Sequence, residues 1–90
     1  MYKLFFHKRS LKQLKKLPKH EQKKILKKIK KLQENPTDFS LNIKPLHNTQ
    51  NSWRVRADNL RAIYTFDRKQ KIIYIEYLGY RGSIYKRIKL

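Results

Sequence analysis

The sequence contains no cysteine. This absence excludes disulfide bridges and thiolate-ligated metal sites, and it fits a protein of a reducing compartment. Long apolar runs are absent as well. The longest apolar stretch near the start, residues 4–6, is far too short for a secretory leader or a membrane helix. We therefore expect a cytoplasmic protein that has no membrane partner.

Acidic residues are scarce. The chain has only six, namely Glu21, Glu34, Asp38, Asp58, Asp67 and Glu76. They are scattered along the sequence, and no two are placed like the carboxylates of a glycosidase or a two-metal nuclease. The histidines His7, His20 and His47 lie far apart and lack metal-ligand spacing, so we expect surface histidines and assign no metal or other cofactor.

Basic residues dominate the composition. There are 24 lysines and arginines among 90 residues, and the formal net charge is +18. Such a charge predicts a polyanionic partner, with nucleic acid as the default. A hydrophobic fraction of 39% is too high for a disordered basic tail. The length predicts one small domain, spanning residues 1–90.

The first third of the chain predicts a strand followed by two helices. Residues 2–8 read as an opening strand. Ser10 is then expected to cap a short helix that Pro18 interrupts. Its apolar residues are Leu11, Leu14 and Leu17.

The second helix is predicted from about Lys19 to Glu34. Ile25, Ile29 and Leu32 follow the i, i+4, i+7 pattern of one buried stripe, and lysines fill the remaining surface. These lysines are open to two interpretations. A solvated helix face is the stronger one, because lysine is a good helix former, and direct contact with RNA is the alternative.

The remainder of the chain predicts a loop and a three-stranded meander. Residues 36–52 show no sustained periodicity and are expected to be loop. The last strand follows a turn at residues 67–70, and its register is undecided. The end is expected to be a loop with at most one helical turn. The predicted fold class is α+β, with an N-terminal strand, a helical hairpin and an antiparallel β-meander whose helices pack on one face.

The stretch WRVRADNLRAIY, residues 53–64, predicts a β-hairpin. Asp58 and Asn59 both tolerate the left-handed conformations of a two-residue turn, which would pair Arg56 with Arg61. Alternation then assigns one face to the core and the other to arginines. The core set is Trp53, Val55, Ala57, Leu60, Ala62, Tyr64 and Phe66, and the opposite set is Arg54, Arg56 and Arg61.

The opposed arginines indicate an anion site. Like charges directly across a ladder repel and cost some tenths of a kcal/mol, so an anionic ligand would offset the repulsion. A solvated basic face is the alternative. Because neither arginine is counted in the core, we expect Arg61→Ala to leave stability unchanged or slightly raised.

The ordered set WRVR, LRAIY and RGSIY, together with the opening strand, a helix pair ending near Asn35-Pro36 and the loop KPLHN, resembles the RelE/ParE superfamily of bacterial toxin-antitoxin toxins. The similarity covers nearly the whole chain and is closer to the RelE-like ribosome-dependent mRNA endonucleases than to the ParE-like gyrase inhibitors. It departs from many relatives in having arginines where they have strand lysines, and Tyr80 where they have histidine.

The resemblance implies a site and a chemistry. Its catalytic residues here are Arg61, Arg81 and Tyr85, and its substrate-binding residues are Arg54, Arg56, Tyr80 and, more weakly, His47. The reaction is attack by the adjacent 2′-hydroxyl, which needs no metal. The arginines would hold the phosphate and stabilise its extra charge, and Tyr85 would take the proton.

The resemblance also implies partners: mRNA with the ribosome and its RNA, and a cognate acidic antitoxin. The toxin is expected to be a monomer when free and part of a hetero-oligomer with the antitoxin. Two other functions stay open at this point, a ParE-like inhibitor of DNA gyrase and a noncatalytic RNA-binding module.

Overall fold

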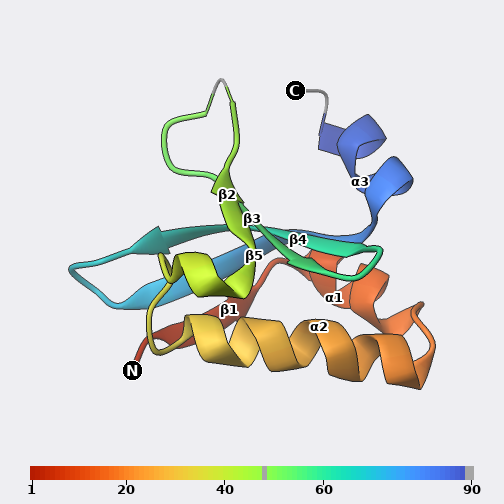
Figure 1. Cartoon of the computed structure of the whole chain (residues 1–90), viewed down its shortest axis with the longest axis horizontal. Coiled ribbons are helices and arrows are strands. Elements are labelled where there is room, and N and C mark those ends of the chain that lie inside the picture. Colours follow the sequence, from red (N-terminus) through yellow and green to blue (C-terminus); the bar gives the residue numbers. More distant parts are fainter. Residues whose placement is uncertain (48, 89–90) are drawn as a thin grey trace.

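The structure is a computed structural model that describes residues 1–47 and 49–88, with side chains described up to residue 84. Its elements are β1 (Lys3–Phe6), α1 (Lys8–Lys15), α2 (Lys19–Leu32), η1 (Phe39–Leu41), β2 (Ile43–Pro45), β3 (Trp53–Ala57), β4 (Leu60–Asp67), β5 (Ile72–Tyr80) and α3 (Arg81–Ile88). Within these residues the strands form one sheet in the order β1-β5-β4-β3-β2 (Figure 1). The α+β class and the antiparallel meander of β3, β4 and β5 are confirmed.

The helices α1 and α2 pack on one face of the sheet, and α3 follows β5 and stands on the opposite side from α2 (Figure 1). Ile25, Ile29 and Leu32 of α2 have no exposed surface, so the predicted stripe is the buried face of the helix. It packs in one core with the predicted inner residues of the hairpin, of which Trp53 is half-buried. None of the helices in the described part of the chain is long and apolar enough to cross a membrane.

The hairpin has the predicted register. Ala57 pairs with Leu60, Arg56 with Arg61 and Val55 with Ala62. Asp58 takes a left-handed φ of 55°, which two-residue hairpin turns require. The register of the last strand, which the sequence left undecided, is set by a β-bulge. Ile63 pairs with Tyr77 but Tyr64 pairs with Ile75, so that Glu76 has no partner across β4.

Two local predictions are wrong, and the pairing of the opening strand was not predicted. The region 36–52 is not all loop, because it contains η1 and the edge strand β2, which pairs with β3. The opening strand β1 pairs with β5 in parallel, so the sheet is mixed. The C-terminal end forms the two-turn helix α3 instead of at most one turn. Three-residue strands carry too little alternation to be recognised from sequence, and pairing partners depend on the whole fold.

The cap of α1 is also different from the prediction. Ser10 lies inside the helix, and the half-buried His7 caps it, with Nδ1 accepting from the Arg9 amide at 3.2 Å. Ser10 is fully buried, and its hydroxyl donates to the carbonyl oxygens of His7 and Ile75 at 2.7 and 2.9 Å. Ser10 therefore ties the helix to the sheet instead of starting the helix.

The hydrogen bond from Ser10 to the Ile75 carbonyl is one of three side-chain hydrogen bonds that cover the edge of β5. The strand β1 pairs only with residues 72–75, and α1 lies beside the rest. Arg9 Nε donates to the Glu76 carbonyl at 2.9 Å, and Gln13 Oε1 accepts from the Leu78 amide at 2.8 Å. Because an open strand edge exposes unpaired amides and carbonyls, these side chains finish a pairing that β1 is too short to complete.

Tyr64 anchors the core to the segment after α2. Its ring is fully buried, and its hydroxyl donates to the Pro36 carbonyl at 2.6 Å. Burial raises the pKa of the Tyr64 hydroxyl, because a phenolate would lose its hydration there. The neutral hydroxyl is thus the form that the fold requires.

We expect Tyr64→Phe to lower the free energy of unfolding by about 1 kcal/mol near neutral pH, since it removes a buried hydrogen bond. Above about pH 10 the unfolded wild-type chain releases the Tyr64 proton while the folded chain keeps it, so the wild type loses stability that the variant does not. Denaturant unfolding of both proteins at about pH 7 and about pH 11 measures the difference. A gap that stays constant across this range would contradict the assignment.

Candidate nucleic-acid site

Three arginines project from the sheet on the side opposite the core. Arg54 and Arg56 alternate with buried Val55 on β3, and Arg61 lies directly across from Arg56 on β4. We call Arg54, Arg56 and Arg61 the arginine face. It exists because the hairpin register places every second residue on this side.

The three members of the arginine face differ in exposure. Arg56 is exposed, whereas Arg61 has only 4% of its surface exposed. Arg61 Nη1 donates to the carbonyl oxygens of Asp58 and Leu60 at 2.7 and 3.0 Å. The expectation that Arg61→Ala leaves stability unchanged assumed that Arg61 lies outside the packed part of the protein, and its burial contradicts this assumption.

Arg54 is half-buried, and its Nε atom is buried without a hydrogen-bond partner in the part of the chain that the structure describes. Neither Arg54 nor Arg56 takes part in any ion pair between described side chains. A buried guanidinium nitrogen without an acceptor is unfavourable, and the absence of ion pairs leaves the charge of both arginines without a partner among the described side chains.

The start of α3 lies against the hairpin turn. The Arg81 amide donates to the Asn59 carbonyl at 2.9 Å, and the Arg81 side chain is exposed. This bond brings Arg81 to the end of the sheet where Arg61 lies. Tyr85 follows one turn later in α3, and its side chain lies outside the described residues.

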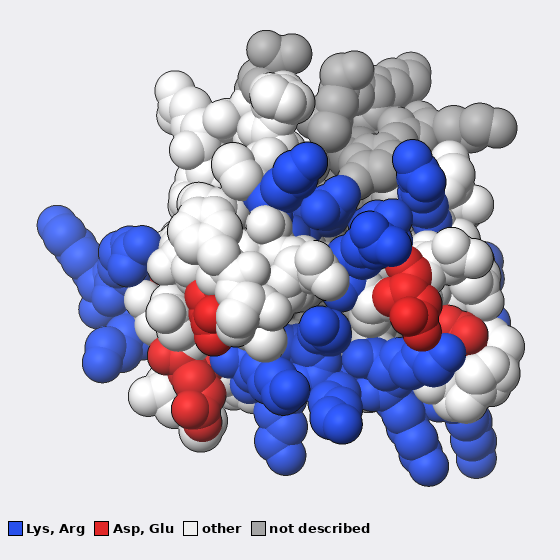
Figure 2. Space-filling model, viewed as in Figure 1, with Lys and Arg blue, Asp and Glu red and all other residues white. Residues whose placement is uncertain are grey.

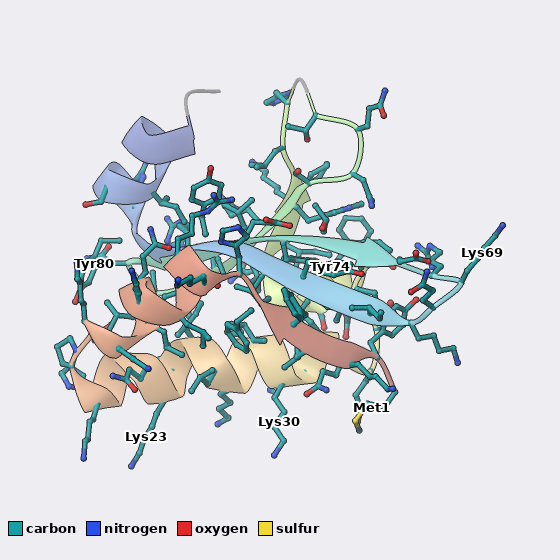
Figure 3. The ribbon with its side chains drawn as sticks, turned by 180° about the vertical axis from the view of Figure 1, so that it is seen from behind. Met1, Lys23, Lys30, Lys69, Tyr74 and Tyr80 are labelled. Carbon is teal, nitrogen blue, oxygen red and sulfur yellow. The ribbon has the colours of Figure 1, made fainter. Side chains whose placement is uncertain are left out.

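Two predicted substrate-binding residues lie elsewhere. Tyr80 pairs with the core residue Leu60, so alternation directs its side chain to the α1 side of the sheet. There it is 42% exposed (Figure 3). It lines a small pocket with Gln13 of α1 and with Lys16, the residue that follows α1. His47 is exposed in the loop between β2 and β3, at the end of β3 opposite the Asp58–Asn59 turn. The structure brings neither residue to the arginine face.

A second basic feature involves the α2 lysines, for which the sequence favoured a solvated face and left contact with RNA as the alternative. Lysines of α2 and residues at the end of β3 line a groove of about 450 Å³, which we call the α2–β3 groove. Its lining residues are Lys24, Lys27, Lys28, Lys31, Asn42, Arg56, Ala57 and Asp58. Figure 2 shows Lys and Arg side chains gathered over α2 and beside the sheet above it. The sequence signal was the spacing of the four lysines at i, i+3, i+4 and i+7, which places them on one helix face.

One carboxylate lies in this groove. Asp58 Oδ2 is 3.1 Å from Lys24 Nζ, and this hydrogen bond, more than the added attraction of Glu21, raises the pKa of Lys24. Lys24 is therefore cationic at neutral pH. Arg56 belongs to both the groove and the arginine face, so the two basic features are adjacent.

Comparison with known proteins identifies the family. The family model described as "ParE toxin of type II toxin-antitoxin system, parDE" matches residues 4–85. A search of curated proteins finds no match.

Solved structures give the same fold. RelE in the archaeal RelE–RelB complex from Pyrococcus horikoshii OT3 is 29% identical, with 91% of this chain and 97% of that chain covered and a TM-score of 0.78. The RelB–RelE antitoxin–toxin complex from Methanococcus jannaschii contains a chain that is 27% identical, with 92% and 96% covered and a TM-score of 0.75. The isolated E. coli RelE toxin is 19% identical, with 99% and 96% covered and a TM-score of 0.78. With a family match over nearly its whole length and the fold of the RelE toxins, the chain belongs to the RelE/ParE superfamily and is a toxin of a type II toxin–antitoxin system.

Proposed function

We propose that this toxin is a metal-independent endonuclease that cleaves mRNA on the ribosome. The observation that carries the proposal is the arginine face, where Arg56 is held opposite Arg61 and neither Arg54 nor Arg56 forms an ion pair with a described side chain. A phosphate group of RNA supplies the oxygens that such an arrangement needs.

In this proposal the arginines act by charge alone. Attack of a 2′-hydroxyl on the neighbouring phosphorus creates a pentacoordinate phosphorane with added negative charge. Arginine stays protonated at any working pH, so it stabilises this charge but does not move protons. Arg61 is the preorganised member, because two backbone carbonyls already fix its guanidinium.

The proton of the 2′-hydroxyl needs a base, and the bond to the leaving 5′-oxygen needs an acid. We assign the base to Tyr85 from the family resemblance. Arg81 stands one turn before it in α3, next to the hairpin turn, and completes the charge clamp. The product is a 2′,3′-cyclic phosphate. Water protonates the leaving 5′-oxygen, and Tyr85 returns the proton of the 2′-hydroxyl to water.

The similarity to archaeal RelE at 29% identity supports this function. The same relatives are found in complexes with RelB, so we assign this toxin a cognate antitoxin whose acidic residues would offset its charge of +18.

The second candidate is a gyrase-directed inhibitor, which the ParE description of the family model favours. Such an inhibitor has no need of guanidinium groups arranged around a phosphate.

Induction of the toxin in growing bacteria, followed by mapping of new 5′ ends, tests the two candidates. We expect cuts within translated messages that keep a fixed position relative to the reading frame, because the ribosome presents the substrate. A reporter message that lacks a start codon should not be cut. Broken DNA without such cuts would instead establish the gyrase-directed function.

The arginine face can be tested with Arg56→Ala. Arg56 is exposed and faces a like charge, so its loss should change thermal stability little. Cleavage of a reporter mRNA on purified ribosomes should fall by about 100-fold, as is typical when one transition-state contact is removed. Arg68→Ala is the matched control, because it removes the same charge from an exposed residue just beyond the far end of β4. Equal loss in both variants would remove the arginine face from the site.

The burial of Arg61 gives a separate prediction about stability. Arg61→Ala should lower the free energy of unfolding by roughly 1–3 kcal/mol, because it removes two hydrogen bonds from a buried group. Arg61→Lys should lower the free energy of unfolding less than Arg61→Ala does, since lysine keeps the positive charge. Denaturant unfolding measures the stability of both variants. Cleavage by the two variants is compared well below the melting temperature of the less stable one. An Arg61→Ala protein as stable as the parent would show that the carbonyl contacts contribute nothing.

A further inference from the structure

The α2–β3 groove holds more positive charge than its own chain neutralises. Lys24 is bonded to Asp58. Lys27, Lys28 and Lys31 form no ion pair with any described side chain. Like charges three and four residues apart on a helix repel, so this row is unfavourable in the free protein unless an anion occupies the groove.

The chemistry of the lining indicates which anion fits. Among the described residues that line the groove, none has an aromatic side chain on which a base could stack, and Ala57 is the only apolar one. An acidic protein segment usually needs apolar anchors for affinity, and none is offered here. Lysines on flexible stems instead suit a row of phosphates, which they contact without reading sequence.

The same lining distinguishes paired from unpaired RNA. Single strands are held by stacking their bases on aromatic rings, whereas helical RNA is recognised through its backbone. We propose that the α2–β3 groove binds the phosphate backbone of base-paired RNA, as a second RNA site beside the arginine face. The choice of RNA over other polyanions rests on the proposed function. Arg56, which lines both features, would connect the structured RNA with the strand that is cut.

The test compares two triple variants of α2 that lose equal charge. The groove variant is Lys27→Gln, Lys28→Gln and Lys31→Gln, which keeps the Lys24–Asp58 bond. The control variant is Lys19→Gln, Lys23→Gln and Lys30→Gln, whose lysines are exposed on the same helix but do not line the groove. Figure 3 shows Lys23 and Lys30 directed away from the sheet.

The probe is a 2′-O-methyl RNA hairpin, which lacks the hydroxyl nucleophile and is not cut. Binding is measured by fluorescence anisotropy over a series of salt concentrations. We expect the groove variant to bind at least about tenfold more weakly, and its plot of log affinity against log salt to be flatter by two to three units, since each lysine–phosphate contact contributes roughly one. The control variant should stay within about twofold of the wild type.

Equal weakening in both variants would overturn the proposal in favour of general charge attraction. Unchanged hairpin binding by the groove variant, with loss of binding to a poly-glutamate probe, would assign the groove to an acidic protein. Tighter binding of a single-stranded 2′-O-methyl probe would overturn the preference for paired RNA.

Circular dichroism should show equal helix content in both variants. If the triple groove variant unfolds, the three single lysine substitutions each give an independent slope of log affinity against log salt. Because the probe is not cleaved, failure of the endonuclease proposal in the 5′-end mapping does not alter the binding result.

Discussion

The Asp58–Asn59 turn is the constraint on which the other features depend. Its two residues set the hairpin register, and a slip of one residue would exchange the core and arginine faces. The same turn is a point of attachment for three parts of the molecule. The Asp58 carbonyl accepts from Arg61, the Asn59 carbonyl accepts from the Arg81 amide, and the Asp58 carboxylate binds Lys24 of α2. One turn therefore positions the buried arginine, the start of α3 and one end of the α2–β3 groove.

The two basic features differ in the way they hold charge. On the arginine face, the guanidinium group of Arg61 is fixed by burial and by backbone carbonyls. Along α2, the lysines that form no ion pair with any described side chain stand on flexible side chains over a buried stripe of Ile25 and Ile29. Fixed guanidinium groups suit a transition state of defined geometry, whereas mobile ammonium groups suit a backbone of repeating phosphates. A net charge alone would not separate these two uses.

Much of the fold follows from local patterns. The spacing of Ile25, Ile29 and Leu32 predicted the buried side of α2, and alternation around Asp58–Asn59 predicted the pairing of Arg56 with Arg61. Both features depend on residues close together in sequence. Ser10 was misassigned as a cap because its partner, the Ile75 carbonyl, is 65 residues away. No local pattern reports such a partner, and the same is true of the parallel pairing of β1 with β5.

For the candidate site, the sequence by itself determined the charge, the alternation of Arg54 and Arg56 with apolar residues, and the family resemblance carried by ordered motifs. Only the tertiary structure decided that Arg61 is buried, that Tyr80 is directed to the α1 side, and that α2 lysines meet the end of β3 in a groove. The physical reason is that a strand or helix pattern defines which side of an element a residue is on. What covers that side depends on elements that are distant in the chain, and burial and the closeness of charges are set only when those elements pack.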